Sequence, residues 1–464
     1  MQQMEFIMQK VKLHDICTLE RGSSPRPIQD YITTAKDGVN WIKIGDTNPN
    51  EKYVNKTAEK ITKEGAKKSR KVEIGDFILS NSMSLGHPFI MNINGYIHDG
   101  WFVLHPDYKK VNRDFLYYSL LSDYVQTQFK GTCTGSVVKN IRSELVNDLD
   151  IFLPDITEQK RISKVLSTID RKIFVNREIN RNLEELAKQI YDYWFVQFDF
   201  PNEEGKPYKS SGGKMVYNEV LKREIPAGWE IKKISSQIKE NIGGDWGKEE
   251  PAGNYQLKVS CCRGADLVSM TDLPTRYILN SNSYKLLEED DMIVEISGGS
   301  PTQATGRCVL ISKEILNSFN NKLICSNFCQ ALSISDKDYV SYFYYMWKMF
   351  YNSDVFFNFE GKTSGIKNFQ YDTFVAEKWY FPPKDLAKKI KEIVSQNYMK
   401  KCALDQENKH LAALRDELLP LLMHGQVTLN SCLSLIFYLY NTIFARFNFT
   451  TRNSKYISTK VMKN

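Results

Sequence analysis

The sequence predicts a mixed α+β fold, with two globular modules separated by two long helices that form an antiparallel coiled coil in a pseudo-two-fold arrangement. Two observations predict it. A mixed α/β segment followed by a long helical segment occurs twice, and the apolar residues of both helical segments recur at coiled-coil spacing. The chain has 464 residues, enough for roughly two to four domains with cores of their own.

The repeat is visible in two similar segments. The chain reads FKGTCTGSVVKN over Phe129–Asn140 and FEGKTSGIKN over Phe359–Asn368. The asparagines that end these segments lie 228 residues apart, as do Pro154 and Pro382 in the strand-like segments that follow. A unit of this size repeated once indicates a duplicated domain plus helix, because solenoid repeats have only about 20 to 50 residues. Two similar modules suggest two similar partners, or one partner contacted in two places.

The composition is that of a soluble, mildly basic protein. Charged residues make up 25% of the chain and the formal net charge is +7. Such a charge allows a nucleic-acid partner without requiring one. The nine cysteines have no framework spacing, so reduced thiols are expected, with a zinc site as the alternative.

The first module is expected at residues 9–153. β-like runs at Trp41–Asp46, Asp76–Ser80 and Trp101–His105 alternate with turns rich in glycine, asparagine and proline. Aromatic and leucine residues recur at helical spacing over Asp114–Lys130, which predicts one helix there.

The first long helix is expected within residues 154–198, from Thr157 to Phe198. Its predicted seam has strict 4-3-4-3 spacing and comprises Ile162, Leu166, Ile169, Ile173, Asn176, Asn180, Leu183, Ala187, Ile190 and Trp194. This period over more than four heptads is typical of a coiled coil. Asn176 and Asn180 are polar seam residues, which usually fix register and partner.

The second half of the chain repeats this order. A linker rich in glycine, proline, serine and charge is expected at 199–228, the second module at 229–383 and the second helix at 384–425. The second seam comprises Leu386, Ile390, Ile393, Asn397, Lys400, Leu404, Glu407, Leu411, Leu414, Leu418 and Leu421. Asn397 is its polar register residue, and Gly425 is a suitable helix stop.

Residues 430–464 form an apolar and then basic extension. Leu433–Phe449 is strongly apolar, but Asn441 and Arg446 interrupt it and it is shorter than the ~20 residues of a spanning helix. The N-terminus lacks the apolar region of a signal peptide. No membrane association is therefore expected.

No pattern predicts a catalytic or metal site. Gly361–Thr363 reads GKT, but the glycine that a phosphate-binding loop needs upstream is Phe356. The chain also lacks a dinucleotide-binding glycine motif, an amino-methyltransferase motif and a histidine pattern for zinc or a triad. The sequence therefore points to surfaces.

Two kinds of surface segment are candidates for nucleic-acid contact. Seven basic residues lie between positions 56 and 71 against two glutamates; this run suits phosphates, or is equally a solvated helix face. The repeated Gly-x-x-x-Gly segments allow close backbone approach and supply hydroxyl and ammonium donors, with a structural turn as the alternative. The candidate contact residues are Gly131, Thr132, Thr134, Gly135, Ser136, Lys139, Gly361, Lys362, Thr363, Ser364, Gly365, Lys367, Lys67, Lys68, Arg70 and Lys71.

The charge balance differs between the modules. Residues 9–153 contain 20 basic and 17 acidic side chains, whereas residues 229–383 contain 16 basic and 19 acidic ones. The second module therefore cannot hold DNA by net charge alone.

Three further segments resemble the specificity subunits of Type I restriction–modification systems. They are TEQKRISKVLSTIDRKIFVNREINRNLEELAKQIYDYWFVQFDF from Thr157, PNEEGKPYKSSGGKMVYNEVLKREIPAGWE from Pro201, and ENKHLAALRDELLPLLMHGQVTL from Glu407. The resemblance covers roughly residues 9–429, and within the modules it extends only to their organisation. The family usually ends near GQVTL, so residues 430–464 depart from its pattern.

The resemblance implies two target-recognition domains, each reading one half of a split site in double-stranded DNA. The helices would set the spacing between the halves and dock two methyltransferase subunits. S-adenosylmethionine, ATP and Mg would be used by these methyltransferase and the restriction/motor subunits, so no cofactor is expected on this non-catalytic, cytoplasmic chain. The alternatives are a coiled-coil adaptor whose modules bind protein, and a self-sufficient nuclease or methyltransferase.

Overall fold

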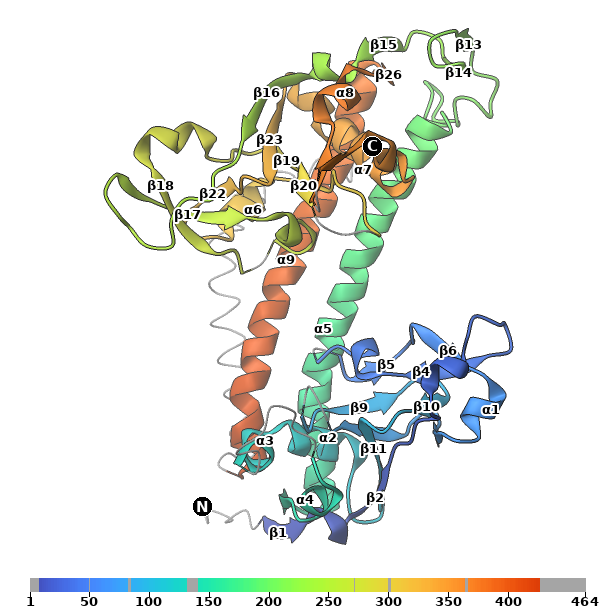
Figure 1. Ribbon diagram of the computed structural model, residues 1–464, viewed down its shortest axis with the longest axis vertical. Helices are drawn as coiled ribbons and strands as arrows, with labels where there is room; N and C mark the ends of the chain where they lie inside the picture. Colours follow the sequence, from blue (N-terminus) through green and yellow to red (C-terminus); the bar gives the residue numbers. More distant parts are fainter. Residues whose placement is uncertain are drawn as a thin grey trace. The chain divides into compact units, whose positions relative to one another are not determined.

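The computed structural model describes residues 8–49, 51–81, 85–131, 141–270, 272–298, 302–363 and 366–425. The chain divides into two compact units: unit 1 comprises Met1–Val175 and Glu407–Asn464, and unit 2 comprises Asn176–Gln406. Two long helices, α5 (Ile156–Tyr191) and α9 (Lys384–Met423), contribute residues to both units (Figure 1). The predicted mixed α+β class is confirmed.

Unit 1 contains two five-stranded sheets and one separate strand pair. Its strands are β1 (Gln9–Lys12), β2 (Cys17–Arg21), β3 (Ile32–Thr33), β4 (Val39–Ile42), β5 (Tyr53–Val54), β6 (Glu59–Ile61), β7 (Arg70–Val72), β8 (Phe77–Ser80), β9 (Pro88–Met91), β10 (Gly95–Ile97), β11 (Trp101–Pro106) and β12 (Asp150–Leu153). The sheet orders are β3-β6-β4-β10-β7 and β2-β11-β8-β9-β5. β1 pairs antiparallel with β12, with Gln9 opposite Leu153. The segment 9–153, predicted as the first module, therefore starts and ends on one strand pair.

The β-like runs of the sequence correspond to β4, β8 and β11. The first run is shorter than predicted, because β4 ends at Ile42 and Ile44–Asp46 forms a 3-10 turn. All four residues of β8 are buried, which suits a strand covered on both faces.

The short helices of unit 1 are α1 (Lys63–Ala66), α2 (Arg113–Leu121), α3 (Asp123–Gly131) and α4 (Ser143–Asn147). The prediction of one helix over Asp114–Lys130 is wrong, because the segment forms two helices, α2 and α3, that are separated at Ser122. Ser122 has an extended ψ of 147°, and its Oγ accepts a hydrogen bond from the Val125 backbone at 3.5 Å. A serine in this conformation caps a new helix.

Both long helices complete the core of unit 1. From α5 the core takes Ile162, Leu166, Ile169 and Ile173, and from α9 it takes Leu414, Leu418, Leu422 and Met423. They pack with α2 and α3. Asp170 bonds Arg415 at 3.1 Å and Lys172 bonds Glu407 at 3.3 Å. Residue numbers rise along α5 as they fall along α9, so the two helices are antiparallel in this unit.

Unit 2 contains several smaller sheets. Its strands are β13 (Met215–Asn218), β14 (Arg223–Pro226), β15 (Glu230–Lys233), β16 (Ile238–Gly243), β17 (Tyr255–Cys262), β18 (Thr275–Leu279), β19 (Met292–Glu295), β20 (Ser297–Gly298), β21 (Cys308–Leu310), β22 (Lys322–Cys325), β23 (Cys329–Ile334), β24 (Glu360–Thr363), β25 (Ile366–Phe369) and β26 (Lys378–Phe381). The orders are β13-β14, β15-β26, β16-β23-β19-β21, β18-β17-β22 and β20-β25-β24. β15 pairs antiparallel with β26, as β1 does with β12 in unit 1.

The helices of unit 2 besides α5 and α9 are α6 (Lys313–Asn317), α7 (Val340–Asn352) and α8 (Tyr371–Ala376). Aromatic residues dominate the main core, where α7 packs against the end of α5. Tyr345 of α7 stacks on Tyr191 of α5 with ring centroids 5.9 Å apart. Asn180 bonds Asp405 and Glu184 pairs with Lys401, so α5 and α9 are antiparallel in unit 2 as well.

The segment 199–228, predicted to be a linker, is folded. It contains the β13–β14 hairpin, and Phe200 stacks on Tyr208 with centroids 4.6 Å apart. Ile225 is buried in the core of unit 2. Its polar composition therefore reflects tight turns rather than a flexible tether.

The predicted α5 seam is largely buried, whereas of the α9 seam only Leu386, Ile390, Leu414 and Leu418 are buried. On α9, Val394 and Leu422 are buried where the sequence predicted Ile393 and Leu421, and Lys400 is exposed. A straight α-helix repeats every 3.6 residues, so a 3.5-residue seam drifts around it. The pseudo-two-fold relation and coiled-coil supercoiling stay predictions.

The helix ends also differ in part from expectation. α5 ends at Tyr191 rather than Phe198 and continues as a π-helical turn over Asp192–Val196, after which Phe198 has φ of 67°. Gly425, two residues after the last residue of α9, has φ of 66°, which confirms it as the helix stop.

Within the described ranges no helix is both long and apolar enough to cross a bilayer. The apolar stretch Leu433–Phe449 and the rest of the extension 430–464 lie outside these ranges.

Leu166→Ala tests the seam of unit 1. Leu166 of α5 is fully buried in the core that this helix shares with α9 and the first module. Its truncation should therefore lower the free energy of unfolding by about 2–5 kcal/mol. Phe174→Ala on the exposed face of the same helix is the control and should change it by less than about 0.5 kcal/mol. Urea denaturation measures both, and equal losses would contradict the seam.

Candidate nucleic-acid interface

The predicted contact residues fall into three groups. Thr132, Thr134, Gly135, Ser136, Lys139, Ser364 and Gly365 lie outside the described residues. Gly131, Lys362 and Thr363 are placed by their backbone, and Gly361, Lys367, Lys67, Lys68, Arg70 and Lys71 are fully described. The two Gly-x-x-x-Gly segments begin in different secondary structure, because Gly131 ends helix α3 whereas Gly361 lies in strand β24.

In unit 1, both ends of the candidate segment lie beside the β8–β9 connection. The Ile141 backbone N–H donates to the Asn81 carbonyl at 3.0 Å. Gly86 has φ of 71°, and a Cβ there would lie 2.4 Å from the Phe129 ring. The Gln126 side chain donates to the Gly86 carbonyl at 3.0 Å. Glycine is therefore required at position 86, and it fixes α3 against this connection.

Unit 2 has a matching arrangement. Gly306 has φ of 97°, a Cβ there would lie 2.7 Å from the Phe356 ring, and Trp347 Nε1 donates to its carbonyl at 2.8 Å. The sequence repeat pairs Phe129 with Phe359, but the packing role belongs to Phe356. The two glycine anchors were missed by the sequence analysis, and similar neighbours do not flank them in the sequence.

The second hairpin is held by polar contacts. β25 pairs with both β24 and β20, and Ser297 Oγ donates to Asn368 Oδ1 at 2.6 Å. Lys367 Nζ lies 2.9 Å from Glu360 Oε2, so this candidate lysine already has a carboxylate partner.

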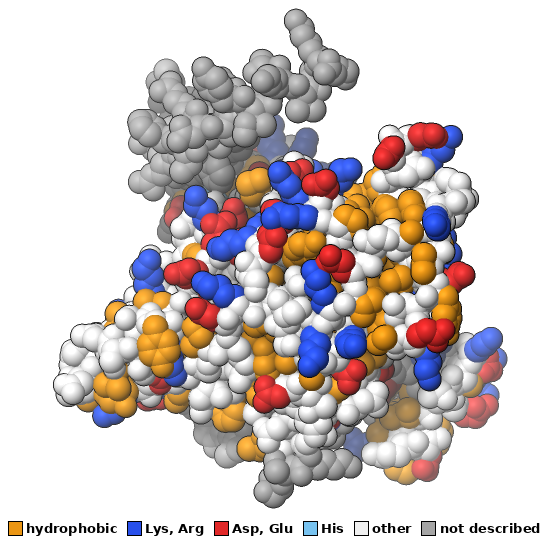
Figure 2. All heavy atoms as spheres, turned by 90° about the horizontal axis from the view of Figure 1, so that it is seen from above, with side chains coloured by type: hydrophobic (Ala, Val, Ile, Leu, Met, Phe, Trp, Pro, Cys, Tyr) orange, Lys and Arg blue, Asp and Glu red, His pale blue; other side chains and the backbone are white. Residues whose placement is uncertain are grey.

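The basic run between positions 56 and 71 is not one helix face. It passes through β6, α1 and the start of β7. Lys68 Nζ bonds the Tyr31 hydroxyl at 2.5 Å, Arg70 pairs with Glu20 at 2.9 Å, and Lys71 pairs with Glu73 at 2.6 Å. These pairs are exposed, so they are weak and a phosphate can compete with them. Figure 2 shows a face on which acidic and basic side chains are interspersed rather than segregated.

A partly buried charged network fixes the first module on the helices of unit 1. The Tyr118 hydroxyl donates to Asp170 Oδ2 at 2.6 Å, and Arg415 donates to Asp170 Oδ1 at 3.1 Å. Beside it, Lys52 Nζ lies 2.9 Å from Asp114 and 4.6 Å from the Tyr117 ring centroid. Burial lowers the pKa of Lys52, an effect that the Asp114 charge opposes. A polar network of this kind specifies one docking geometry.

The predicted register residues differ in burial, and one of them, Asn180, bonds from α5 to α9. Asn176 is fully buried and Asn180 is 7% exposed, whereas Asn397 is half-buried. Asn180 Nδ2 donates to Asp405 Oδ1 at 2.7 Å and to the Lys401 carbonyl at 3.4 Å. Asn180 thus makes interhelical hydrogen bonds, and the setting of register by these residues stays a prediction.

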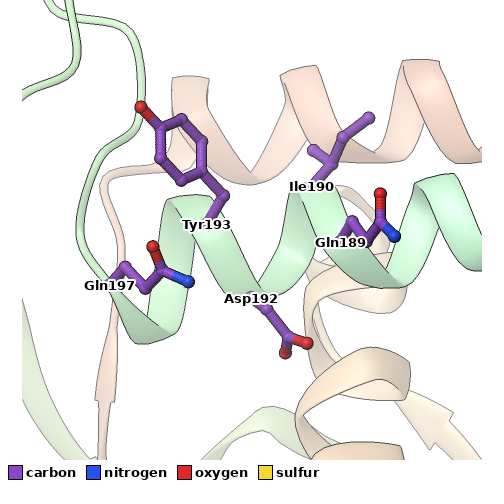
Figure 3. A pocket seen from close by; sticks show the side chains of 5 residues that line it. All are labelled: Gln189, Ile190, Asp192, Tyr193 and Gln197. Atoms are coloured by element: carbon purple, nitrogen blue, oxygen red, sulfur yellow. The ribbon is translucent and has the colours of Figure 1, made fainter.

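A shallow hollow of about 450 Å³ lies at the end of α5. It is lined by Gln189, Ile190, Asp192, Tyr193 and Gln197, which project from the last turns of α5 and the following π-helical turn (Figure 3). Burial raises the pKa of Asp192. The open shape and mixed lining suit a protein side chain better than an enclosed substrate.

The described part of the chain holds no group of three or more histidine, cysteine or acidic side chains placed to bind a metal ion. Burial raises the pKa of Cys261 and of Cys329 to about 12, so both thiols stay protonated at neutral pH.

Comparison with known proteins gives one consistent family. Residues 7–185 match the model of the Type I restriction modification DNA specificity domain. The MjaIX Type I restriction enzyme specificity subunit of Methanocaldococcus jannaschii is 24% identical over 433 residues, which cover 90% of this chain and 92% of that protein. The HindI specificity subunit of Haemophilus influenzae is 30% identical over 99 residues, 21% of this chain and 22% of that protein.

A solved structure has the same fold. The S subunit of a Type I restriction–modification system from M. genitalium superposes with a TM-score of 0.53. The superposition covers 91% of this chain and 97% of that one, at 16% sequence identity.

His87, which follows the Gly86 anchor, should make unit 1 sensitive to acid. Burial lowers the pKa of His87 to about 4, whereas an unfolded histidine titrates near 6.5. Between these values the unfolded chain binds a proton that the folded chain does not. The contribution of neutral His87 to the free energy of unfolding is therefore fully present above about pH 6.5. It falls by up to about 3 kcal/mol as the pH drops to 4.

The measurement is urea denaturation at pH 7.5 and 4.5. His87→Gln should lose less free energy of unfolding between the two pH values than the wild type, by about 2 kcal/mol or more. His105→Gln, at a half-exposed histidine on β11, is the control and should follow the wild type. Identical pH dependence in His87→Gln and the wild type would contradict the assignment.

Proposed function

Because this chain belongs to the family of Type I restriction–modification specificity subunits, we propose that it recognises a bipartite DNA target, with each globular module reading one half. Proteins of this family provide target recognition and are not catalytic; methylation and cleavage belong to partner subunits. The observation that carries the proposal is the duplication of a module and its helix within one chain.

Three features of the modules support two readers. Each module starts and ends on an antiparallel strand pair, β1–β12 or β15–β26. Each has a left-handed glycine packed on a phenylalanine ring, Gly86 or Gly306. Each anchor adjoins a candidate contact segment. A rigid scaffold that presents variable connections suits base recognition, because the same fold can then read different sequences.

The proposed partners are double-stranded DNA, two methyltransferase subunits and, through them, restriction subunits, in the cytoplasm. S-adenosylmethionine, ATP and Mg would act on those subunits. Exposed apolar residues at the end of α5 and in the π-helical turn after it support docking there: Leu186 of α5 is 45% exposed, and Tyr193 of the turn, in the hollow of Figure 3, is 40% exposed. The two helices would also set the distance between the half-sites.

The first test exchanges residues 229–383 for the matching module of another specificity subunit. Methylation mapping of cells that carry the subunit and its methyltransferase should show one changed half-site and one unchanged half-site. The reason is that the two modules belong to two different hydrophobic cores, so exchange of the second module leaves the core of the first unchanged. A change in both halves would contradict the two-reader proposal. An adaptor that binds protein would leave methylation unaltered.

The second test lengthens both helices. Seven residues inserted after Asn180 in α5 and seven after Lys401 in α9 add two turns, about 10.5 Å, while preserving the seam. Methylated sites should keep both half-site sequences and gain about three base pairs of spacer at ~3.4 Å each. The same insertion in α5 alone puts the Asn180–Asp405 and Glu184–Lys401 contacts out of register with each other and should abolish methylation. An unchanged spacer with both insertions would show that the helices do not set the distance.

A further inference from the structure

The hairpin formed by β24 and β25 contains a carboxylate that occupies an anion site. Glu360 Oε1 accepts hydrogen bonds from the Thr305 backbone N–H at 2.8 Å and from the Thr305 hydroxyl at 3.3 Å. Its other oxygen lies 2.9 Å from Lys367 Nζ. The Glu360 side chain is only 9% exposed and that of Lys367 is 25% exposed.

This set of donors is the kind that binds phosphate. A backbone N–H, a hydroxyl and an ammonium group are common contacts to DNA phosphate oxygens. In unit 2 all three already bind the Glu360 carboxylate. Glu360 therefore holds the one partly exposed donor of this set, the Lys367 ammonium group, which a DNA phosphate could otherwise contact.

The surroundings of Lys367 explain why a counter-charge is favourable here. The Lys367 side chain is only 25% exposed, and a charge that is largely removed from water is costly unless it is paired. The Glu360 carboxylate provides this pairing, and the Phe357 ring centroid lies 4.9 Å from Lys367 Nζ.

A second buried pair adjoins the hairpin. Arg307 makes two hydrogen bonds to Glu295, whose side chain is 5% exposed. A Cβ on Gly264 would lie 2.6 Å from Glu295 Oε1, so the carboxylate is tightly enclosed. Gly298, in strand β20, is paired with Lys367. Arg307 and Lys367 are thus both neutralised by carboxylates of the same module, consistent with its excess of acidic residues.

We propose that Glu360 is an internal counter-anion that keeps Lys367 from binding phosphates of non-cognate DNA, and so sets the selectivity of the second module. The proposal rests on the proposed DNA-recognition function. Glu360 is a positioning residue, because it acts through Lys367. Non-cognate DNA is bound through its phosphates rather than through matching base contacts. To bind Lys367, these phosphates must displace the Glu360 carboxylate.

The experiment measures binding of the full-length chain to a duplex of random sequence between 50 and 200 mM salt. Glu360→Gln keeps an acceptor for Thr305 but removes the negative charge. It should bind more tightly than the wild type, and the slope of log affinity against log salt should steepen by about 0.9. Its advantage should therefore be roughly threefold smaller at 200 mM than at 50 mM salt.

Matched variants separate this effect from net charge. Glu230→Gln removes the partner of Lys232 in β15, outside the hairpin, and should leave the affinity and the slope as in the wild type. Lys367→Gln should leave the slope unchanged, because Lys367 does not contact non-cognate phosphates. The double variant Glu360→Gln/Lys367→Gln should lose the gain of Glu360→Gln.

Several results would overturn the inference. They are an unchanged or weaker affinity in a folded Glu360→Gln variant, an equal gain in Glu230→Gln, or a gain that persists in the double variant. If Glu360→Gln does not fold, a shallower salt slope in Lys367→Gln overturns it instead. Wild-type protein that binds no duplex at all would reject the proposed function and this inference together, whereas salt-dependent binding without the Glu360 effect rejects the inference alone.

Discussion

The modules depend on the burial of their own helices against α5 and α9. In unit 1 the faces of α2 and α3 join a core that includes α5 and α9, and in unit 2 α7 packs against the end of α5. An amphipathic helix gains most of its stability from such packing rather than from propensity. Neither module can therefore be separated cleanly from the helices, which belong to the cores as much as to any spacer.

The two units meet this constraint with different chemistry. In unit 1 the first module is fixed by hydrogen bonds and charge, where Tyr118 and Arg415 share the Asp170 carboxylate. In unit 2 the corresponding contact is aromatic, with Tyr345 stacked on Tyr191. Buried polar contacts tolerate few geometries, whereas stacked rings tolerate more. The duplicated halves thus share an architecture without sharing the interactions that fix it.

Internal neutralisation of positive charge is a second common theme. Several cations that the sequence offers to DNA are already paired, at the surface in the first module and partly buried in the second. Unpaired basic side chains add little sequence specificity to a DNA-binding protein, because phosphates are the same at every site whereas base edges differ. Under the proposed DNA-recognition function, such pairing would lower affinity for all DNA and leave discrimination to contacts with the bases.

The sequence by itself determined the mixed α+β class, the buried seam of α5, the helix stop at Gly425 and the resemblance to Type I specificity subunits. These are local or periodic features, carried by residue spacing and by similar segments. Only the tertiary structure decided the break at Ser122, the folding of the segment 199–228, the drift of the α9 seam to Val394 and Leu422, and the pairing of Lys367 with Glu360. Each of these depends on which residues the fold brings together across the chain, and a side chain's charge or apolar character does not specify its partner. The sequence therefore identified Lys367 as a possible DNA contact, and the fold showed that its ammonium group already pairs with the Glu360 carboxylate.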